Sequence, residues 1–276
     1  MGSYFSTPSN VKIKPKRMDF SFKKVPNFWF DQEPVQTHLL NALSLTFPDG
    51  ERFFVDSVRA FRTHATSSQQ QKDISGFIGQ EAMHSLEHDS FNQFLAANGY
   101  QEQVRNGQAL AKFFIDGGRE NMSKEQQLAA TAALEHITAI MAQWLLADSN
   151  LEKIDPSVRK LWLWHAIEET EHKAVAFDLL QQVTGGSYGK RVRILIPATW
   201  FLSVYCVTYT YQFLREDGLH RKPLTLANGL WQLVKPKGLM ASVVPAWFQY
   251  FKPRFHPWET DDSHLIDVWR QKLETA

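Results

Sequence analysis

The sequence predicts an all-α protein built on a helical bundle. From Pro34 onward, apolar residues recur at steps of three and four, whereas the alternation typical of strands is scarce. Helix start and stop signals divide this part of the chain into segments long enough to form buried helices. Four of these segments carry glutamates and histidines inside their apolar stripes, where burial is costly without a partner. We therefore expect a bundle that buries these side chains together.

Composition and charge exclude several classes of protein. Of the 276 residues, 43% are hydrophobic and 21% are charged, which is ordinary for a folded chain and excludes bulk disorder. The net charge of +1 gives no reason to expect nucleic acid as a partner. Cys206 is the only cysteine, which excludes an intrachain disulfide, a cysteine-rich zinc site and an iron–sulfur cluster. The N-terminus has basic residues but no apolar run behind them, so we expect a cytoplasmic protein.

Three parts of the chain differ in pattern. Residues 1–33 mix Ser, Pro, Lys and aromatic residues without a period, and we expect an extended arm on the surface. Residues 34–184 carry the helical periodicity and form the predicted bundle. Residues 185–276 are rich in aromatic residues, and we expect additional helices packed on the bundle.

The first half of the bundle contains three predicted helices. The first covers 34–46 and is followed by a break at Phe47-Pro48-Asp49-Gly50. The second runs from 49 to 65, with Pro48 and Asp49 as start signals. The third covers 73–97 and stops at Asn98-Gly99.

The second half begins with a long connection over residues 100–122, containing a short helix near 109–115 and closed by Gly117-Gly118. Ser123 and Gln126 then form a capping box, which predicts a helix to 147.

Asp155 followed by Pro156 starts the last predicted helix of the bundle, which runs to about 182. Gly185-Gly186 ends it.

Carboxylates and imidazoles interrupt the apolar stripes of the four segments that begin near 49, 73, 123 and 155. Steps of three and four keep them on the buried faces. They are Glu51 in the first segment, Glu81, His84 and His88 in the second, Glu135 in the third, and His165, Glu169 and His172 in the fourth.

The order of these residues carries the chemistry. Glutamate, Glu-x-x-His, glutamate and Glu-x-x-His follow one another along the chain, which resembles the order of the ferritin-like carboxylate proteins that hold two metal ions. Four glutamates also balance the charge of two divalent ions when the histidines are neutral, which a dry interior tolerates.

Several neighbouring residues leave alternatives open. His165 is one turn before Glu169 and is either a third imidazole ligand or a packed histidine. His88 is expected to be an outer partner of the site. His136 points about 100° away from Glu135 by helical geometry and is expected to lie outside it. Glu168 competes with Glu169 for the same role.

Two families resemble this sequence. The whole stretch, including Phe47-Pro48-Asp49-Gly50-Glu51 and Phe255-His256-Pro257-Trp258, is similar to a bacterial family of predicted metal-dependent hydrolases. The order of the site residues resembles that of the arylamine N-oxygenases, which are ferritin-like di-iron enzymes with a third histidine. These resemblances imply a metal-ligand set of Glu51, Glu81, His84, Glu135, His165, Glu169 and His172.

Three functions compete at this stage. The first is a di-iron enzyme that uses O2 and an electron donor to hydroxylate, N-oxygenate or desaturate a small apolar or amine-bearing substrate. The second is a dinuclear metal-dependent hydrolase. The third is metal storage or oxidative protection without a substrate. We expect the first, with two iron ions, although manganese or a mixed manganese–iron pair suits the same ligands.

The aromatic-rich extension raises a separate question. Residues 194–214 contain no charged side chain and are long enough for a membrane span, which needs ~20 apolar residues. Polar residues dilute the segment, so we rank a buried or interface helix first, a membrane-surface contact second and a span third. The mixture of aromatic and basic residues at 247–254 suits a membrane interface, a lid or an aromatic rim. Membrane contact through 190–260, a peripheral place at the inner face of the membrane and a homodimer are therefore left open.

Overall fold

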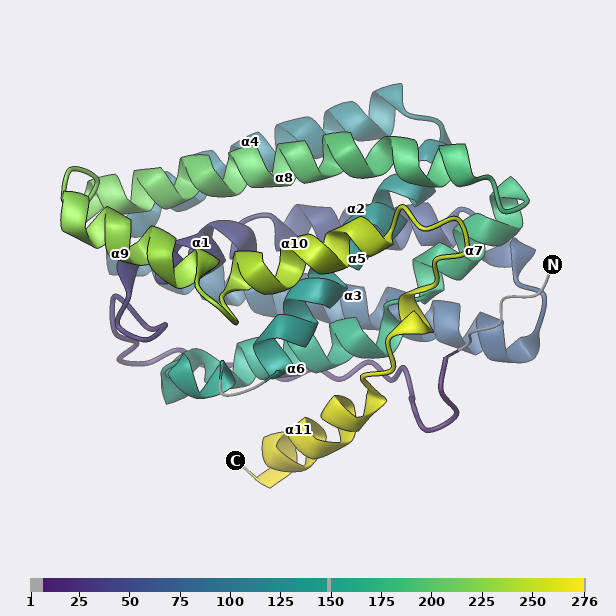
Figure 1. Ribbon diagram of the computed structural model, residues 1–276, viewed down its shortest axis with the longest axis horizontal. Coiled ribbons are helices and arrows are strands. Elements are labelled where there is room, and N and C mark those ends of the chain that lie inside the picture. Colours follow the sequence, from purple (N-terminus) through teal and green to yellow (C-terminus); the bar gives the residue numbers. More distant parts are fainter. Residues whose placement is uncertain (1–6, 148–149, 276) are drawn as a thin grey trace.

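The computed structural model describes residues 7–147 and 150–275 and confirms the all-helical prediction (Figure 1). Within these residues the only β-pairing is an isolated bridge between Phe30 and Ile154. The α-helices are α1 (Pro34–Ser44), α2 (Phe47–Arg59), α3 (Ser68–Leu95), α4 (Gln101–Asn121), α5 (Lys124–Leu146), α6 (Pro156–His172), α7 (Val175–Thr184), α8 (Tyr188–Glu216), α9 (Pro223–Val234), α10 (Leu239–Gln249) and α11 (Ser263–Thr275).

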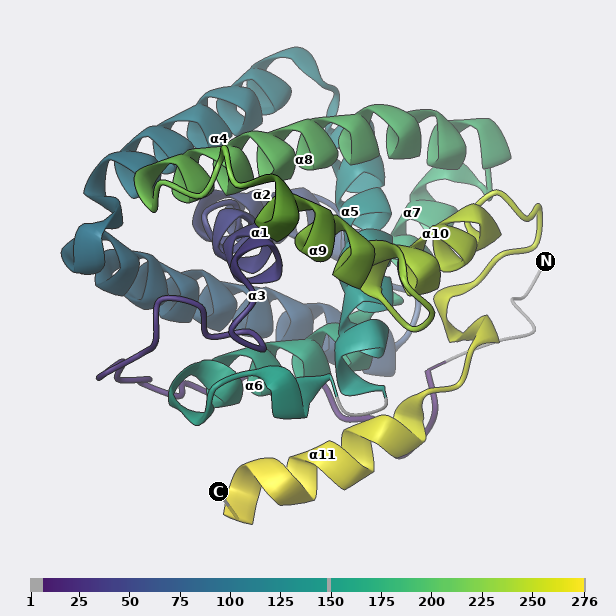
Figure 2. The same ribbon diagram turned by 60° about the vertical axis from the view of Figure 1, so that its left-hand side comes forward.

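Four of these helices close into a bundle. α2 packs on α3 and α5, and α6 packs on the same two helices from the other side. α4 and α8 lie together along one side of this group, α9 and α10 lie across it, and α11 lies beyond α6 (Figures 1 and 2).

Two of the predicted helix starts are confirmed in atomic detail. The Ser123 hydroxyl accepts a hydrogen bond from the backbone N–H of Gln126 at 3.2 Å, and the Gln126 side chain accepts one from the Ser123 N–H at 2.8 Å. These bonds satisfy amide groups that the first turn of α5 leaves without partners. Asp155 caps α6 in the same way by accepting from the Ser157 N–H at 2.9 Å.

The boundaries of α2 and α3 differ from the prediction. α2 begins at Phe47, so the expected break at 47–50 is a helix start, with Pro48 in the first turn where its missing N–H is not needed. The helix also ends at Arg59 rather than at 65. α3 begins at Ser68 because the Ser67 side chain caps it by accepting from the Gln70 N–H at 3.1 Å.

The connection between α3 and α5 was predicted wrongly. Gly99 adopts φ +105° and kinks the chain as expected, but α4 then runs without interruption from Gln101 to Asn121, through the glycines expected to close the connection. Each glycine costs a helix about 1 kcal/mol. Burial of the stripe Val104, Gly107 and Ala111 offsets this cost. At Gly107 a side chain would lie 2.5 Å from Leu45, so this glycine permits close packing.

The predicted helix over 155–182 is two helices. α6 ends at His172, and α7 begins at Val175 after a short turn. Lys173 in the turn donates to Asp262 at 2.5 Å and to the Thr260 carbonyl at 3.0 Å, and its ammonium lies 4.0 Å from the centre of the Trp258 ring. The C-terminal part of the chain therefore holds the turn in place, which no local sequence signal indicated.

The described part of the N-terminal arm, residues 7–33, is extended, as expected, but docks closely on α3. Side chains at Gly76 and Gly79 would lie 2.5 Å from the Ile13 carbonyl and 2.2 Å from the Pro15 ring. The buried Glu87 carboxylate accepts three backbone N–H groups of the arm, including that of Met18 at 3.0 Å. Two glycines and one carboxylate on α3 thus form the seat of the arm.

The largest hydrophobic core extends through all three parts of the chain. It contains Trp29 of the arm, Leu145 of α5, Phe213 of α8 and Trp269 of α11. The predicted domain boundaries after 33 and 184 stay a prediction. The core shows that the described arm and the C-terminal helices stabilise the same interior as the bundle.

Candidate metal centre

The four helices of the bundle bring together all seven side chains of the predicted ligand set. Each of these residues is at most 4% exposed. α2 contributes Glu51, α3 contributes Glu81 and His84, α5 contributes Glu135, and α6 contributes His165, Glu169 and His172.

These residues form two neighbouring groups. In the first group, Glu51, His84 and His165 offer donor atoms that lie within 4.8 Å of one another. In the second, Glu81, Glu135, Glu169 and His172 do the same. The first group contains two imidazoles and the second contains three carboxylates, so the two positions differ in chemical character.

Glu169 joins the two groups. Its Oε1 lies 3.1 Å from His165 Nε2 and 3.6 Å from His84 Nδ1, which belong to the first group. The same oxygen lies 3.6 Å from His172 Nε2 in the second group. A carboxylate in this position can bridge two ions.

His172 is the centre of the second group. Its Nε2 lies 3.0 Å from Glu81 Oε1 and 3.4 Å from Glu135 Oε2. Burial by itself would lower the pKa of His172, but the carboxylates of Glu135 and Glu81 raise that pKa well above its usual range. Without a metal, a proton on this imidazole therefore balances part of the negative charge.

The carboxylates respond differently to the same burial. Burial, and then the neighbouring Glu81, raise the pKa of Glu51 well above the usual value. Burial followed by the charge of Glu169 does the same for Glu135. Burial would also raise the pKa of Glu169, but hydrogen bonds with His165 and His172 lower it well below the usual range. Glu169 is therefore the carboxylate that stays ionised most readily.

Orphaned polar atoms provide the test of whether metal ions fit this cluster. Both carboxylate oxygens of Glu51 and of Glu135 are buried without a hydrogen-bond partner. An unsatisfied buried polar group costs about 1–3 kcal/mol, and more when it is charged. Oxygen and imidazole nitrogen are the donors that iron, manganese and other divalent ions accept. The donor set fits a pair of divalent ions.

Outer hydrogen bonds hold the imidazole of His165. His88 Nε2 lies 2.8 Å from His165 Nδ1, and His88 Nδ1 lies 2.9 Å from the Ser44 hydroxyl. Ser44 in turn donates to Asn92 Oδ1 at 2.8 Å. His88 is thus an outer partner, in the role that the sequence suggested, and it leaves Nε2 of His165 directed at Glu169.

A second chain of hydrogen bonds holds His172. Its Nδ1 lies 3.0 Å from Gln80 Oε1, and Gln80 donates to Glu171 at 2.8 Å, which also pairs with Arg270 of α11. Glu171 and the neighbouring Lys173 are both buried, because α11 and the segment before it cover them. No sequence signal connects Arg270 with His172, since they lie 98 positions apart along the chain.

Glu168 and His136 are the remaining two neighbours of the predicted ligand set. Glu168 Oε2 lies 3.1 Å from His84 Nε2, and Trp164 donates to the other oxygen of Glu168 at 2.8 Å. Burial raises the pKa of Glu168 to about 9. Glu168 therefore contacts Nε2 of His84 and lies outside the two groups, whereas the Glu169 carboxylate faces both groups. His136 packs its ring 4.9 Å from that of Tyr250, outside both groups.

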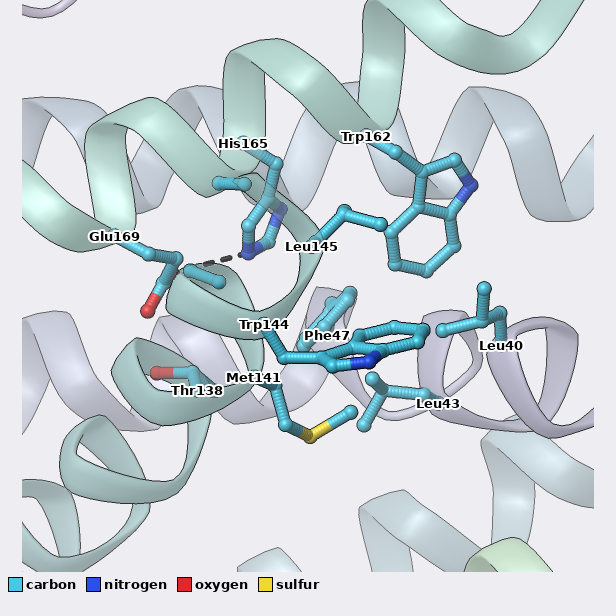
Figure 3. Close-up of a pocket in the computed structure, with 12 residues that line it drawn as sticks. Leu40, Leu43, Phe47, Thr138, Met141, Trp144, Leu145, Trp162, His165 and Glu169 are labelled. Carbon is cyan, nitrogen blue, oxygen red and sulfur yellow. Dashed lines mark ion pairs between the residues drawn. The ribbon is translucent and has the colours of Figure 1, made fainter. Parts of the chain in front are cut away.

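An apolar cavity of about 40 Å³ adjoins the cluster (Figure 3). His165 and Glu169 lie at one end of it, and Trp162, Trp144 and Leu145 are among the residues that line the rest. On the other side of the cluster, the fully buried Phe77 places its ring 4.9 Å from that of His172. Apolar side chains therefore keep bulk water from the cluster on both sides.

These features define an all-helical protein with a buried carboxylate–imidazole cluster that could hold two metal ions. A family model described as "Predicted metal-dependent hydrolase" matches residues 14–261, and the chain belongs to this family. No curated protein and no solved structure matches the chain. The family confirms the first resemblance drawn from the sequence, while the links to ferritin-like proteins and to the N-oxygenases stay predictions. Its description supports a metal-dependent enzyme and favours hydrolysis over the oxidation expected first.

Proposed function

We propose that the chain is a dinuclear metal-dependent hydrolase that acts on a small, largely apolar ester. The observation that carries this proposal is the position of two donor groups, linked by Glu169, at the end of an apolar cavity. The residues of the two groups would hold a pair of divalent ions, whose chemistry there would be Lewis acidity and an activated water. The family description names the same class of reaction.

The residues of the chain would bind and orient the substrate. Trp144, Trp162 and Leu145 would hold its apolar part in the cavity, which leaves the scissile bond near His165 and Glu169. Hydrolysis forms a bond between the carbonyl carbon and a water oxygen and breaks the bond to the leaving alcohol, which receives a proton.

The outer hydrogen bonds of the two histidines would keep the ligand geometry fixed during this reaction. His88 holds His165, and Gln80 holds His172, so neither ring can rotate without breaking a buried hydrogen bond. Such rigidity lets a site stabilise charge in the transition state without reorganising.

O2-dependent oxidation of a small apolar or amine-bearing substrate is the second candidate. The observation that favours it is the donor set itself, in which buried glutamates and three imidazoles suit iron or manganese in a dry interior. This reaction needs an electron donor. Phe77 and the residues of the cavity would keep water away from the reacting groups.

One experiment separates the candidates. The purified chain is loaded anaerobically with zinc, manganese or iron(II) and offered nitrophenyl esters of increasing acyl length, with and without O2. The hydrolase proposal predicts metal-dependent release of nitrophenol without O2 consumption. It also predicts loss of turnover in Glu169→Ala and retention in His136→Ala, whose histidine is equally buried but outside the cluster.

The alternative outcomes are equally specific. Consumption of O2 by the reduced iron form, without ester turnover, would replace hydrolysis with oxidation. Uptake of metal without turnover of esters and without O2 consumption beyond iron oxidation would instead favour storage or oxidative protection.

A further inference from the structure

Helix α8 has an exposed apolar stripe along its outer face. Trp200 is 72% exposed and Val207 is 67% exposed, and the spacing of the stripe keeps its members on one side of the helix. The stripe consists of Ile196, Trp200, Val204, Val207 and Tyr211. The opposite face, which includes Tyr205 and Phe213, is buried on the bundle. The expectation of a buried helix therefore holds for one face only. Of the most apolar 18-residue stretch of α8, only 22% is buried.

Helices α9 and α10 extend this apolar surface. Leu224 and Trp231 on α9 are 85% and 59% exposed, and Phe248 on α10 is 60% exposed. α9 packs on α10, and Trp247 of α10 donates to the Thr199 hydroxyl of α8 at 2.9 Å. In both views α9 and α10 lie across the front of the bundle, below α8, which runs along its upper edge (Figures 1 and 2). We call this surface the apolar layer.

The charge of the apolar layer differs from that of the whole chain. Residues 188–258 contain ten lysines and arginines and two acidic residues, whereas the whole chain has a net charge of +1. Exposed basic residues stand at the ends of the helices, with Arg193 near the start of α8, Arg215 at its end, and Arg221 and Lys222 before α9. Apolar stripes flanked by basic residues complement an anionic lipid surface.

We propose that the apolar layer binds an anionic lipid surface, with α8, α9 and α10 lying in the plane of the headgroups. Exposed apolar side chains of this number mark an interaction surface rather than ordinary exposure. Trp200, Trp231 and Phe248 would enter the boundary between headgroups and acyl chains, and the arginines and lysines would contact the headgroups.

The structure argues against two other uses of the layer. By length and composition α8 could span a membrane. However, its buried Arg191 donates to the Tyr250 and Lys252 carbonyls, which a span would break. Pairing with a second copy of the chain would bring two strongly basic surfaces together, which is unfavourable.

Vesicle flotation of the metal-loaded full chain tests the proposal. We expect binding to vesicles of mixed phosphatidylcholine and phosphatidylglycerol, and little binding to phosphatidylcholine alone. Val207→Glu in the layer should abolish flotation. The matched control is Val268→Glu on α11, a valine that is also half-exposed or more but lies away from the layer, and it should float like the parent.

The basic residues provide an independent test. Each removed lysine or arginine should weaken binding about fivefold, because a basic residue near an anionic surface contributes about 1 kcal/mol. Arg221→Gln combined with Lys222→Gln should therefore weaken vesicle binding about 25-fold. A higher salt concentration should weaken binding as well. Lys72→Gln, an exposed lysine on α3, should change nothing.

Circular dichroism and metal content confirm in each case that the variant is folded. Equal flotation of all variants, or no flotation of the parent, would overturn the proposal. A change from dimer to monomer in Val207→Glu, without vesicle binding by the parent, would overturn it in favour of a homodimer interface.

Discussion

The buried carboxylate–imidazole cluster and the apolar layer both depart from the usual distribution of side chains, but in opposite ways. The centre of the bundle buries four carboxylates whose oxygens find few hydrogen bonds. The outer faces of α8, α9 and α10 leave tryptophan, phenylalanine and valine in solvent. Both arrangements cost free energy in the isolated chain, and each would become favourable with the partner proposed for it, a cation inside and a lipid surface outside. A departure from the usual pattern of buried apolar and exposed polar side chains therefore indicates the chemistry that a binding partner would need.

The largest difference between the two regions should lie in how much the free energy of unfolding falls when an apolar side chain is truncated. Phe77→Ala should lower the free energy of unfolding by about 3–5 kcal/mol because Phe77 is fully buried against His172. Trp200→Ser should change it by no more than about 0.5 kcal/mol, since an exposed side chain contributes little packing. Urea unfolding of both variants measures the contrast. A large loss in Trp200→Ser would mean that the layer serves stability and not binding.

A second variant separates stability from metal binding. Glu51→Leu should raise the stability of the metal-free protein by about 1–3 kcal/mol, because two buried oxygens without partners are removed. The same variant should lose the extra stability that added metal gives the parent. Thermal unfolding with and without metal measures both effects. Glu102→Leu, at an exposed position of α4, is the control and should alter neither.

The pH dependence follows from the raised pKa values of Glu51 and Glu135. In the metal-free protein these carboxyls keep their protons above the pH at which an unfolded chain releases them, so their contribution to stability is lost as the pH rises through the raised pKa values. Metal ions displace the protons and remove this loss. The difference in melting temperature between metal-loaded and metal-free protein should therefore grow from mildly acidic to mildly alkaline pH. A difference that shrinks over this range would be inconsistent with ligation by these residues.

The outer hydrogen bonds should have a smaller effect. His88→Ala should weaken metal binding about 10–100-fold because His165 loses the partner that orients its ring. His136→Ala removes another buried histidine, whose pKa burial lowers to about 4, but should leave the metal affinity unchanged. Competition with a chelator measures both affinities, and equal losses would point to a general effect of emptying the core.

Much of the fold could be predicted because its signals are local. The capping box at Ser123 and the Asp155-Pro156 start each act within one turn of helix. The helical period also placed Glu81 and His84 on one face and therefore in the same interior.

The errors arose where distant residues decide the structure. The turn after His172 is held by Asp262, and α4 is stabilised by packing at Gly107, neither of which leaves a local signal. The hydrogen-bond chain from Arg270 to His172 was missed for the same reason. The exposed face of α8 was ranked below a buried one because an apolar sequence has the same period whether its partner is protein or lipid.

Metal analysis tests the central claim most directly. The parent chain, Glu81→Ala, His172→Ala and His136→Ala are purified under the same anaerobic conditions, and the metal ions per chain are counted. The proposed centre predicts two ions in the parent and in His136→Ala, and fewer in the other two variants. Equal metal content in all four proteins would contradict the assignment of the buried cluster as a metal centre.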